Sequence, residues 1–133
     1  MSRFVDSNVF IYHIDGNPTF GEKARVILLR IEGGEEAVTS TLVLEEVCIH
    51  VEQEYSASDI PTVLHSILSY DSLKVEPYTV GDMLRSAEML KDSGFKIDWD
   101  DAIIAAVMER LEIKEIYSND SHFDKIPHLK RVF

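Results

Sequence analysis

Short apolar runs alternate along the chain with longer segments whose hydrophobic residues recur every three or four positions. The short runs are typical of buried strands, and the longer segments are typical of helices that bury one face. Strands are predicted at about residues 3–5, 37–40, 73–77, 115–117 and 130–133. Helices are predicted at about residues 9–12, 19–31, 41–55, 58–68 and 79–94. A further, unusually apolar helix is predicted at residues 102–108, and residues 97–101 form its start.

This alternation indicates an α/β fold, because strands separated by helices pair in parallel through right-handed crossovers. We therefore expect a three-layer α/β/α sandwich with a mainly parallel sheet of about five short strands. Two local details are also expected. Ser7 or Asn8 should cap the first helix, and Met83, Leu84, Ala87 and Leu90 should form the buried face of the helix at 79–94.

Length and composition limit the class of protein. A chain of 133 residues with 45% hydrophobic residues is typical of one compact domain, here residues 1–133, without a linker. No run of about 18 apolar residues is present, the N-terminus lacks signal-peptide features, and a lone cysteine cannot form an intrachain disulfide. We therefore expect no membrane association and a cytoplasmic location.

The net charge of −11 argues against nucleic-acid binding by the surface as a whole, although it leaves room for one local site. Four acidic residues stand where strands end or on helices that leave strand ends: Asp6, Glu46, Asp101 and Asp120. A parallel sheet would bring them to one edge, where carboxylates repel one another unless one takes up a proton or a cation binds between them.

Oxygen ligands without a suitably spaced histidine or cysteine favour Mg²⁺ or Mn²⁺. A hard cation that keeps some of its water is suited to phosphate chemistry, since it polarises a phosphoryl oxygen and activates water. Another carboxylate could accept the proton that the water loses. The pattern therefore predicts phosphodiester hydrolysis, and no glycine-rich phosphate loop or CxxC pair competes with it.

Four motifs resemble PIN-domain ribonucleases of the VapC toxin type, in the family's order and over almost the whole chain. They are residues 5–9 (VDSNV), 40–47 (STLVLEEV), 101–106 (DAIIAA) and 118–124 (SNDSHFD). The resemblance implies that Asp6 and Asp101 are the principal metal ligands, that Glu46 is the third acidic residue and that Asp120 is the fourth. Three supporting polar positions are also implied: Ser7, Asn8 and Ser118.

The register is open at two places. Glu45 adjoins Glu46, and the family pattern, which puts the acid just before a hydrophobic residue, favours Glu46. Asp98 and Asp100 precede Asp101, and the pattern of an acid directly before an alanine favours Asp101.

The resemblance further implies a homodimer, a small cognate antitoxin that masks the acidic edge, and a structured RNA as substrate. Arg25 and Lys125 are candidate contacts for RNA phosphates, although neither belongs to a dense basic patch. Two other classes stay open. One is a catalytically inactive PIN-like RNA-binding or scaffold subunit, and the other is a metal-dependent phosphatase or phosphoacceptor, which the lack of an acidic pair beside Asp6 disfavours.

Overall fold

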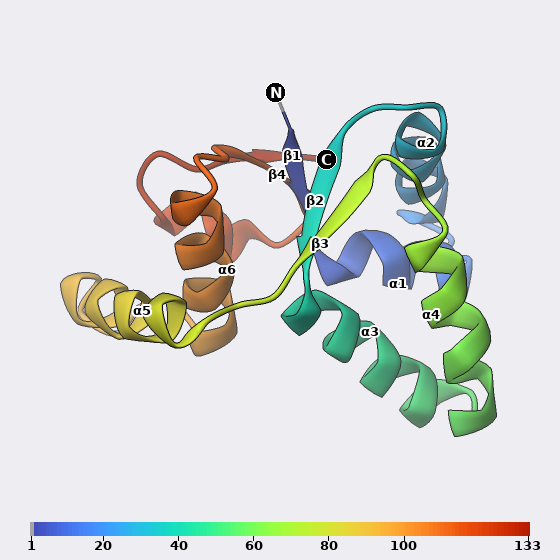
Figure 1. Ribbon diagram of the computed structural model, residues 1–133, viewed down its shortest axis with the longest axis horizontal. Helices are drawn as coiled ribbons and strands as arrows, with labels where there is room; N and C mark the ends of the chain where they lie inside the picture. The colour runs from blue at the N-terminus through green and yellow to red at the C-terminus, as the bar shows by residue number, and fades with distance from the viewer. Residues whose placement is uncertain (1) are drawn as a thin grey trace.

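A five-stranded parallel sheet runs through the middle of the protein in the computed structural model, which describes residues 2–133 (Figure 1). Its strands are β1 (Arg3–Val5), β2 (Ala37–Ser40), β3 (Leu73–Glu76), β4 (Glu115–Tyr117) and β5 (Lys130–Val132). They lie in the order β3-β2-β1-β4-β5, and every neighbouring pair is parallel. The predicted sheet of about five short strands is confirmed, and the described strands are all parallel.

Helices cover both faces of this sheet and form the outer two layers. They are α1 (Ser7–Asp15), α2 (Gly21–Glu32), α3 (Thr41–Glu54), α4 (Ile60–Leu68), α5 (Val80–Asp92) and α6 (Trp99–Arg110), with short 3-10 helices η1 (Ala57–Asp59) and η2 (Ser121–Lys125). Figure 1 shows α1 to α4 on one side of the sheet and α5 and α6 on the other. None of the helices within residues 2–133 is long and apolar enough to cross a membrane.

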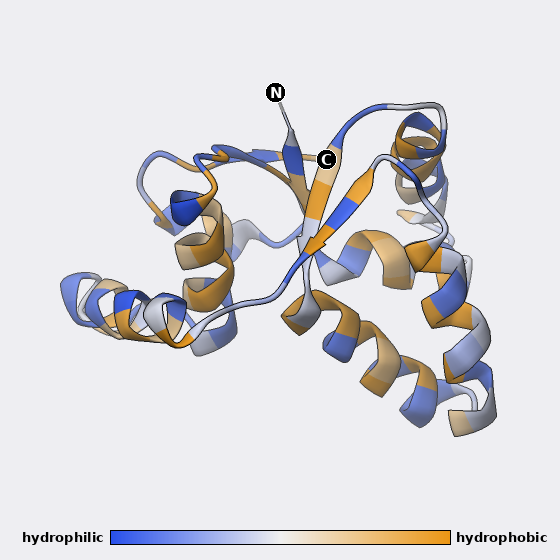
Figure 2. Cartoon of the chain, in the orientation of Figure 1, coloured by the Kyte–Doolittle hydropathy of each residue, from blue (hydrophilic) through white to orange (hydrophobic). Residues whose placement is uncertain are grey.

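The middle of the sheet and α6 form the core that fixes the acidic edge. All four residues of β2 are buried, as is every residue of α6 from Asp101 to Met108. Figure 2 shows hydrophobic residues concentrated along α6 and on the strands. Because β1 pairs with β2 on one side and β4 on the other, the residues that follow β1 and β4 are held at neighbouring positions of one edge.

Two local expectations were wrong. The cap of α1 is Asp6, not Ser7 or Asn8, because the Asp6 side chain accepts a hydrogen bond from the backbone N–H of Ser7 at 2.8 Å. In α5, Met83 and Leu84 are exposed and Ala87 is exposed as well, so only Leu90 of the expected stripe is partly buried. The buried side of α5 carries polar residues instead, Asp82 and Ser86.

Asp82 links α5 to the end of α6. It closes a capping box with Thr79, whose backbone N–H donates to Asp82 Oδ2 at 2.9 Å and whose Oγ1 accepts from the Asp82 N–H at 3.1 Å. Arg110 donates to both carboxylate oxygens, from Nε at 2.9 Å and from Nη2 at 3.0 Å. Burial opposes ionisation of Asp82, but the hydrogen bonds from Arg110 and Thr79 outweigh it and lower the pKa of the carboxyl group.

Replacing Asp82 with alanine should destabilise the protein by roughly 2–3 kcal/mol, because the helix loses its cap and Arg110 loses its partner. This loss of stability is smaller than the loss expected for a fully buried ion pair, because the Arg110 side chain is 38% exposed. Urea unfolding measures the change. Asp92→Ala removes an exposed carboxylate near the end of the same helix and is the matched control. Equal midpoints for both variants would show that the Asp82–Arg110 contact is not stabilising.

Candidate active site

Asp6 is held at the end of β1 by contacts to both of its carboxylate oxygens. Oδ1 accepts the capping hydrogen bond from Ser7, and Oδ2 accepts from Ser118 Oγ at 2.6 Å and from Asn8 Nδ2 at 3.4 Å. The residue is only 5% exposed. Asp6 is therefore both the cap of α1 and a fixed carboxylate at the sheet edge.

Glu46 faces Asp6 from α3, whereas its neighbour Glu45 does not. Ser7 Oγ lies 3.3 Å from Glu46 Oε2 and 3.5 Å from Asp6 Oδ1, so one hydroxyl lies between the two acids. Glu45 is exposed. The other oxygen of Glu46, Oε1, is buried and has no hydrogen-bond partner among residues 2–133. The geometry thus favours Glu46 for the third acidic position.

The three aspartates at the start of α6 differ in exposure and in hydrogen bonding. The Asp101 side chain is 8% exposed, and no described residue donates a hydrogen bond to it. Asp100 is exposed, and its Oδ1 accepts from the Asp101 N–H at 2.9 Å. Asp98 is the N-cap residue, yet its side chain makes no capping hydrogen bond. Of the three, Asp101 is the one buried at the sheet edge.

The segment after β4 completes the edge. Ser118 is fully buried, and its Oγ accepts from the backbone N–H of Asp120 at 3.0 Å and from Asn8 Nδ2 at 3.2 Å. Asp120 is partly exposed and caps η2 through its Oδ1, which accepts from the His122 N–H at 2.9 Å. The structure therefore brings the predicted residues Asp6, Ser7, Asn8 and Ser118 into one hydrogen-bonded network, which Glu46 and Asp120 join from either side.

Burial and mutual repulsion disfavour the charged form of these carboxyl groups. Burial raises the pKa of Asp101 to about 8, with further increases from Asp100, Asp120 and Asp6. Burial, together with Asp6 and Asp100, raises the pKa of Glu46 to about 7. The pKa of Asp6 is also raised, chiefly by burial, although its hydrogen bonds from Ser118 and Ser7 oppose this.

These carboxylates lack a compensating lysine or arginine. In the described part of the chain, no Lys or Arg forms an ion pair with Asp6, Glu46, Asp100, Asp101 or Asp120. The nearest titratable base is His122 of η2, whose Nδ1 lies 3.4 Å from Asp120 and 3.7 Å from Asp101. The predicted acidic site did not include His122, although His122 follows Asp120 by two residues in the last of the four motifs.

The site fits a divalent cation. Its donors at the sheet edge are carboxylate oxygens, the oxygens that Mg²⁺ and Mn²⁺ prefer. Within residues 2–133, Glu46 has a buried oxygen without a hydrogen-bond partner, and no Lys or Arg forms an ion pair that would compensate the negative charge. A bound cation would remove both penalties, and Asp6 and Asp101 are the two carboxylates of this edge that are only 5% exposed.

The two candidate RNA contacts lie outside this network. Arg25 is exposed on α2 and is paired with Glu22, at 2.8 Å and 3.1 Å. Lys125 is exposed and lines a cavity of about 730 Å³ beside α5 and α6 with, among others, Lys114 and His128. None of the acidic residues of the sheet edge lines that cavity. No hydrogen bond or ion pair within residues 2–133 connects Arg25 or Lys125 to the acidic group.

The chain belongs to the PIN domain family, whose profile matches residues 3–129. The family predicted from the four sequence motifs is thus confirmed. No protein among those with curated descriptions matches the sequence.

Solved structures share the fold. One is VapC20 of Mycobacterium tuberculosis, described as a sarcin-ricin loop cleaving toxin, with a TM-score of 0.76 and 19% identity over 95% of both chains. Another is VapBC2 of Rickettsia felis bound to a fragment of its promoter DNA, with a TM-score of 0.76 and 20% identity over 99% of this chain and 98% of that one. A third is DNA-bound VapBC of Salmonella typhimurium, with a TM-score of 0.72 and 19% identity over 99% and 98%.

Proposed function

We propose that the protein is a metal-dependent endoribonuclease and the toxin of a toxin-antitoxin pair. The observation that carries this proposal is the buried, uncompensated group of carboxylates at the carboxyl edge of a PIN-domain sheet. The fold is shared with VapC20, whose described action is cleavage of the sarcin-ricin loop. A cytoplasmic location belongs to the same proposal, because the substrate would be cellular RNA.

Each residue of the edge has a role in this proposal. Asp6 and Asp101 would hold Mg²⁺ or Mn²⁺, which supplies charge for a phosphoryl oxygen and lowers the pKa of water. Ser118 and Asn8 hold Asp6 in place through hydrogen bonds to its Oδ2. Glu46, which faces Asp6 across the Ser7 hydroxyl, would accept the proton that the water loses. Asp120 is the fourth acidic residue and adds negative charge at the open side.

Cleavage of a panel of structured RNAs tests the activity. Cleavage that requires Mg²⁺ or Mn²⁺ and stops with EDTA is expected, since the carboxylates alone repel the phosphate. RNA binding without cleavage under all metal conditions would instead support the inactive RNA-binding or scaffold alternative. Arg25 and Lys125 are retained as candidate RNA contacts. For Arg25, binding to RNA would require separation from Glu22.

An antitoxin is the second part of the proposal. VapBC structures of Rickettsia felis and Salmonella typhimurium share this fold, and both are complexes bound to DNA. A small partner could block the acidic edge with a cationic side chain, because an arginine placed among unpaired carboxylates would supply the charge that they lack.

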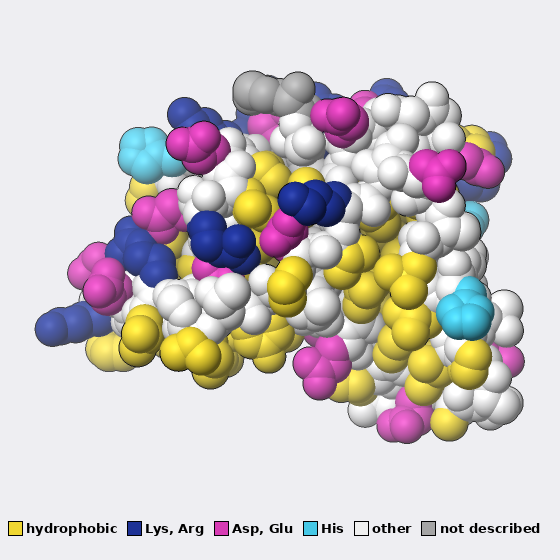
Figure 3. All heavy atoms as spheres, viewed as in Figure 1, with side chains coloured by type: hydrophobic (Ala, Val, Ile, Leu, Met, Phe, Trp, Pro, Cys, Tyr) yellow, Lys and Arg dark blue, Asp and Glu magenta, His cyan; other side chains and the backbone are white. Residues whose placement is uncertain are grey.

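We also propose a homodimer, formed through an apolar patch defined by Val80, Met83, Leu84, Phe95 and Trp99. These side chains are exposed, Val80 to 73% and Leu84 to 67%. Figure 3 shows hydrophobic side chains in a row along the lower edge of α5. Two copies that each carry a net charge of −11 repel one another, so their contact must be one where hydrophobic burial outweighs the repulsion.

Leu84→Glu should convert the dimer to a monomer, because it would place a charge in the middle of the apolar contact. Light scattering during size-exclusion chromatography gives the mass. Leu68→Glu, at another exposed leucine on α4, is the matched control and should remain dimeric. A Leu84→Glu protein with the mass of a dimer would contradict this interface.

A further inference from the structure

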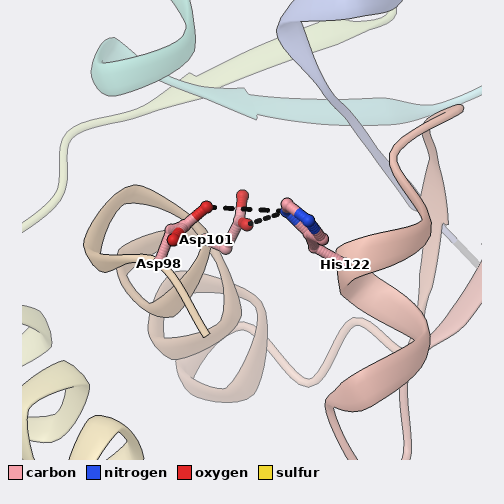
Figure 4. A group of neighbouring side chains, drawn as sticks. All are labelled: Asp98, Asp101 and His122. Carbon is pink, nitrogen blue, oxygen red and sulfur yellow. Dashed lines mark ion pairs between the residues drawn. The ribbon is translucent and has the colours of Figure 1, made fainter. Parts of the chain in front are cut away.

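Asp98, Asp101 and His122 form a cluster at the outer side of the acidic edge (Figure 4). The proposed function assigns no role to Asp98 or His122. Among residues 2–133, it is the one group of three or more His, Cys, Asp or Glu side chains whose ligand atoms all lie within 4.8 Å of one another. His122 Nδ1 is 3.5 Å from Asp98 Oδ2 and 3.7 Å from Asp101 Oδ2. Figure 4 shows the carboxylates of Asp98, just before α6, and of Asp101, in its first turn, pointing toward the imidazole of His122 on η2.

Figure 4 marks the contacts of His122 with Asp98 and Asp101 as ion pairs, but two observations indicate that these contacts leave Asp101 unsatisfied. The Asp101 side chain is 8% exposed and points into the cluster, yet it accepts no hydrogen bond from any residue in the described range. The contacts to His122 are too long for hydrogen bonds. A buried carboxylate without a hydrogen bond is costly unless another group supplies the compensating charge.

Asp98 provides independent support. An aspartate at the N-cap position of a helix normally accepts a hydrogen bond from the first turn. Here Asp98 occupies that position in α6 without making such a bond, while Asp100 accepts from a backbone N–H of that turn. Capping therefore does not explain the orientation of the Asp98 carboxylate toward His122.

We propose that Asp98, Asp101 and His122 bind a second divalent cation, with Asp101 shared between this cation and the one held with Asp6. A mixed set of carboxylate oxygens and an imidazole nitrogen favours first-row transition metals, whereas Mg²⁺ prefers oxygen alone. The second site should therefore prefer Mn²⁺ over Mg²⁺. It rests on the proposed metal dependence of the first site, with which it shares Asp101, whereas Asp98 and His122 belong to the second site alone.

Mn²⁺ binding followed by electron paramagnetic resonance tests this directly. The wild-type protein should bind two Mn²⁺ per chain, and pulsed spectra should show modulation from the ¹⁴N nucleus of a coordinated imidazole. His122→Asn should bind one Mn²⁺ and lose the ¹⁴N modulation. Asp98→Ala should weaken the second Mn²⁺ by about tenfold or more. Excess Mg²⁺ should displace the first Mn²⁺ more readily than the second.

His128→Asn is the matched control, because it removes an exposed histidine outside the cluster, at a position with φ of 70° that asparagine tolerates. It should bind two Mn²⁺ with unchanged ¹⁴N modulation. Two bound ions in His122→Asn, or no ¹⁴N modulation in the Mn²⁺-loaded wild type, would overturn the second site. If the wild type bound only one Mn²⁺, and this binding required Asp6 but not His122, the second site would also be overturned. The proposed ribonuclease function would not be affected by that result. Cleavage of RNA that persists in EDTA would defeat the ribonuclease mechanism instead.

Discussion

Replacing Asp101 with asparagine should reduce metal-dependent RNA cleavage by more than about a hundredfold, and Asp6→Asn should do the same. Each substitution removes one of the two buried charges that would hold the cation, while the side-chain volume stays the same. Ser118→Ala should have a smaller effect of about tenfold to a hundredfold, because it removes only the 2.6 Å hydrogen bond that orients Asp6. Initial cleavage rates at saturating Mn²⁺ rank the three variants.

Asp124→Asn is the control for these measurements. Asp124 lies in the same C-terminal motif, but its carboxylate is exposed and paired with Arg131 at 3.0 Å, away from the Asp6 network. Its cleavage rate should equal that of the wild type. Full activity in either Asp6→Asn or Asp101→Asn would rule out the metal site as assigned, provided that both variants bind RNA normally.

The sheet could be predicted from the sequence because its signal is local and strong. Residues 37–40 and 115–117 form short apolar runs, and each is followed by a capping or polar residue where the next element begins. Parallel pairing then follows from the helices between the strands. In the sequence, Asp6 and Asp120 both follow predicted strands, which placed both acids at the carboxyl end of a parallel sheet. In the structure, those two strands, β1 and β4, are neighbours.

The exposed side of α5 could not be predicted in the same way. Met83, Leu84 and Ala87 have helical spacing and are apolar, which normally indicates the buried face. In the structure, the inner side of α5 instead carries Asp82, whose charge is satisfied by Arg110 from α6. That pairing joins residues 28 positions apart, and no local pattern reveals it.

The sequence identified candidate residues that the structure places at one edge of the sheet, but it could not predict their contacts. Spacing could place Glu46 on the correct helix, yet only the orientation of α3 shows that Glu46 and not Glu45 lies beside Ser7. His122 was not predicted as a metal ligand, because a histidine without a second histidine or cysteine at ligand spacing does not by itself indicate a metal site. In the structure, η2 approaches the start of α6, and this brings His122 next to Asp98 and Asp101.

The metal-free protein should lose stability as the pH rises from about 4 to 8. Burial and neighbouring carboxylates raise the pKa of Asp101 from its ordinary 3.8 to about 8 in the folded protein, and that of Glu46 from 4.5 to about 7. Between these values the folded state holds protons that the unfolded state has released, so the free energy of unfolding falls with increasing pH. Below about pH 4 and above about pH 8 the contribution of Asp101 becomes constant.

A loss of a few kcal/mol is expected across this window. It is smaller than the full value of about 1.4 kcal/mol per pH unit for each held proton, because Glu46 is partly exposed and water screens the repulsion between the carboxylates. Asp101→Asn should flatten the decline and be more stable than the wild type at pH 8.5, because its neutral amide avoids the repulsion from Asp6 and Asp100. Thermal melting in EDTA at a series of pH values measures this. The same substitution would therefore abolish cleavage while raising stability, as is typical of residues that are strained for function.

Mn²⁺ separates this explanation from a general effect of pH. At pH 8.5 the ion should raise the melting temperature of the wild type, because it binds the folded state and neutralises the carboxylates, and it should raise that of Asp101→Asn much less. Asp59→Asn, at an exposed carboxylate remote from the network, should keep the pH dependence and the Mn²⁺ response of the wild type. If the melting temperatures of Asp101→Asn and the wild type fell in parallel with increasing pH, the repulsion would have to arise from other residues. Asp101 would then not be an uncompensated buried charge.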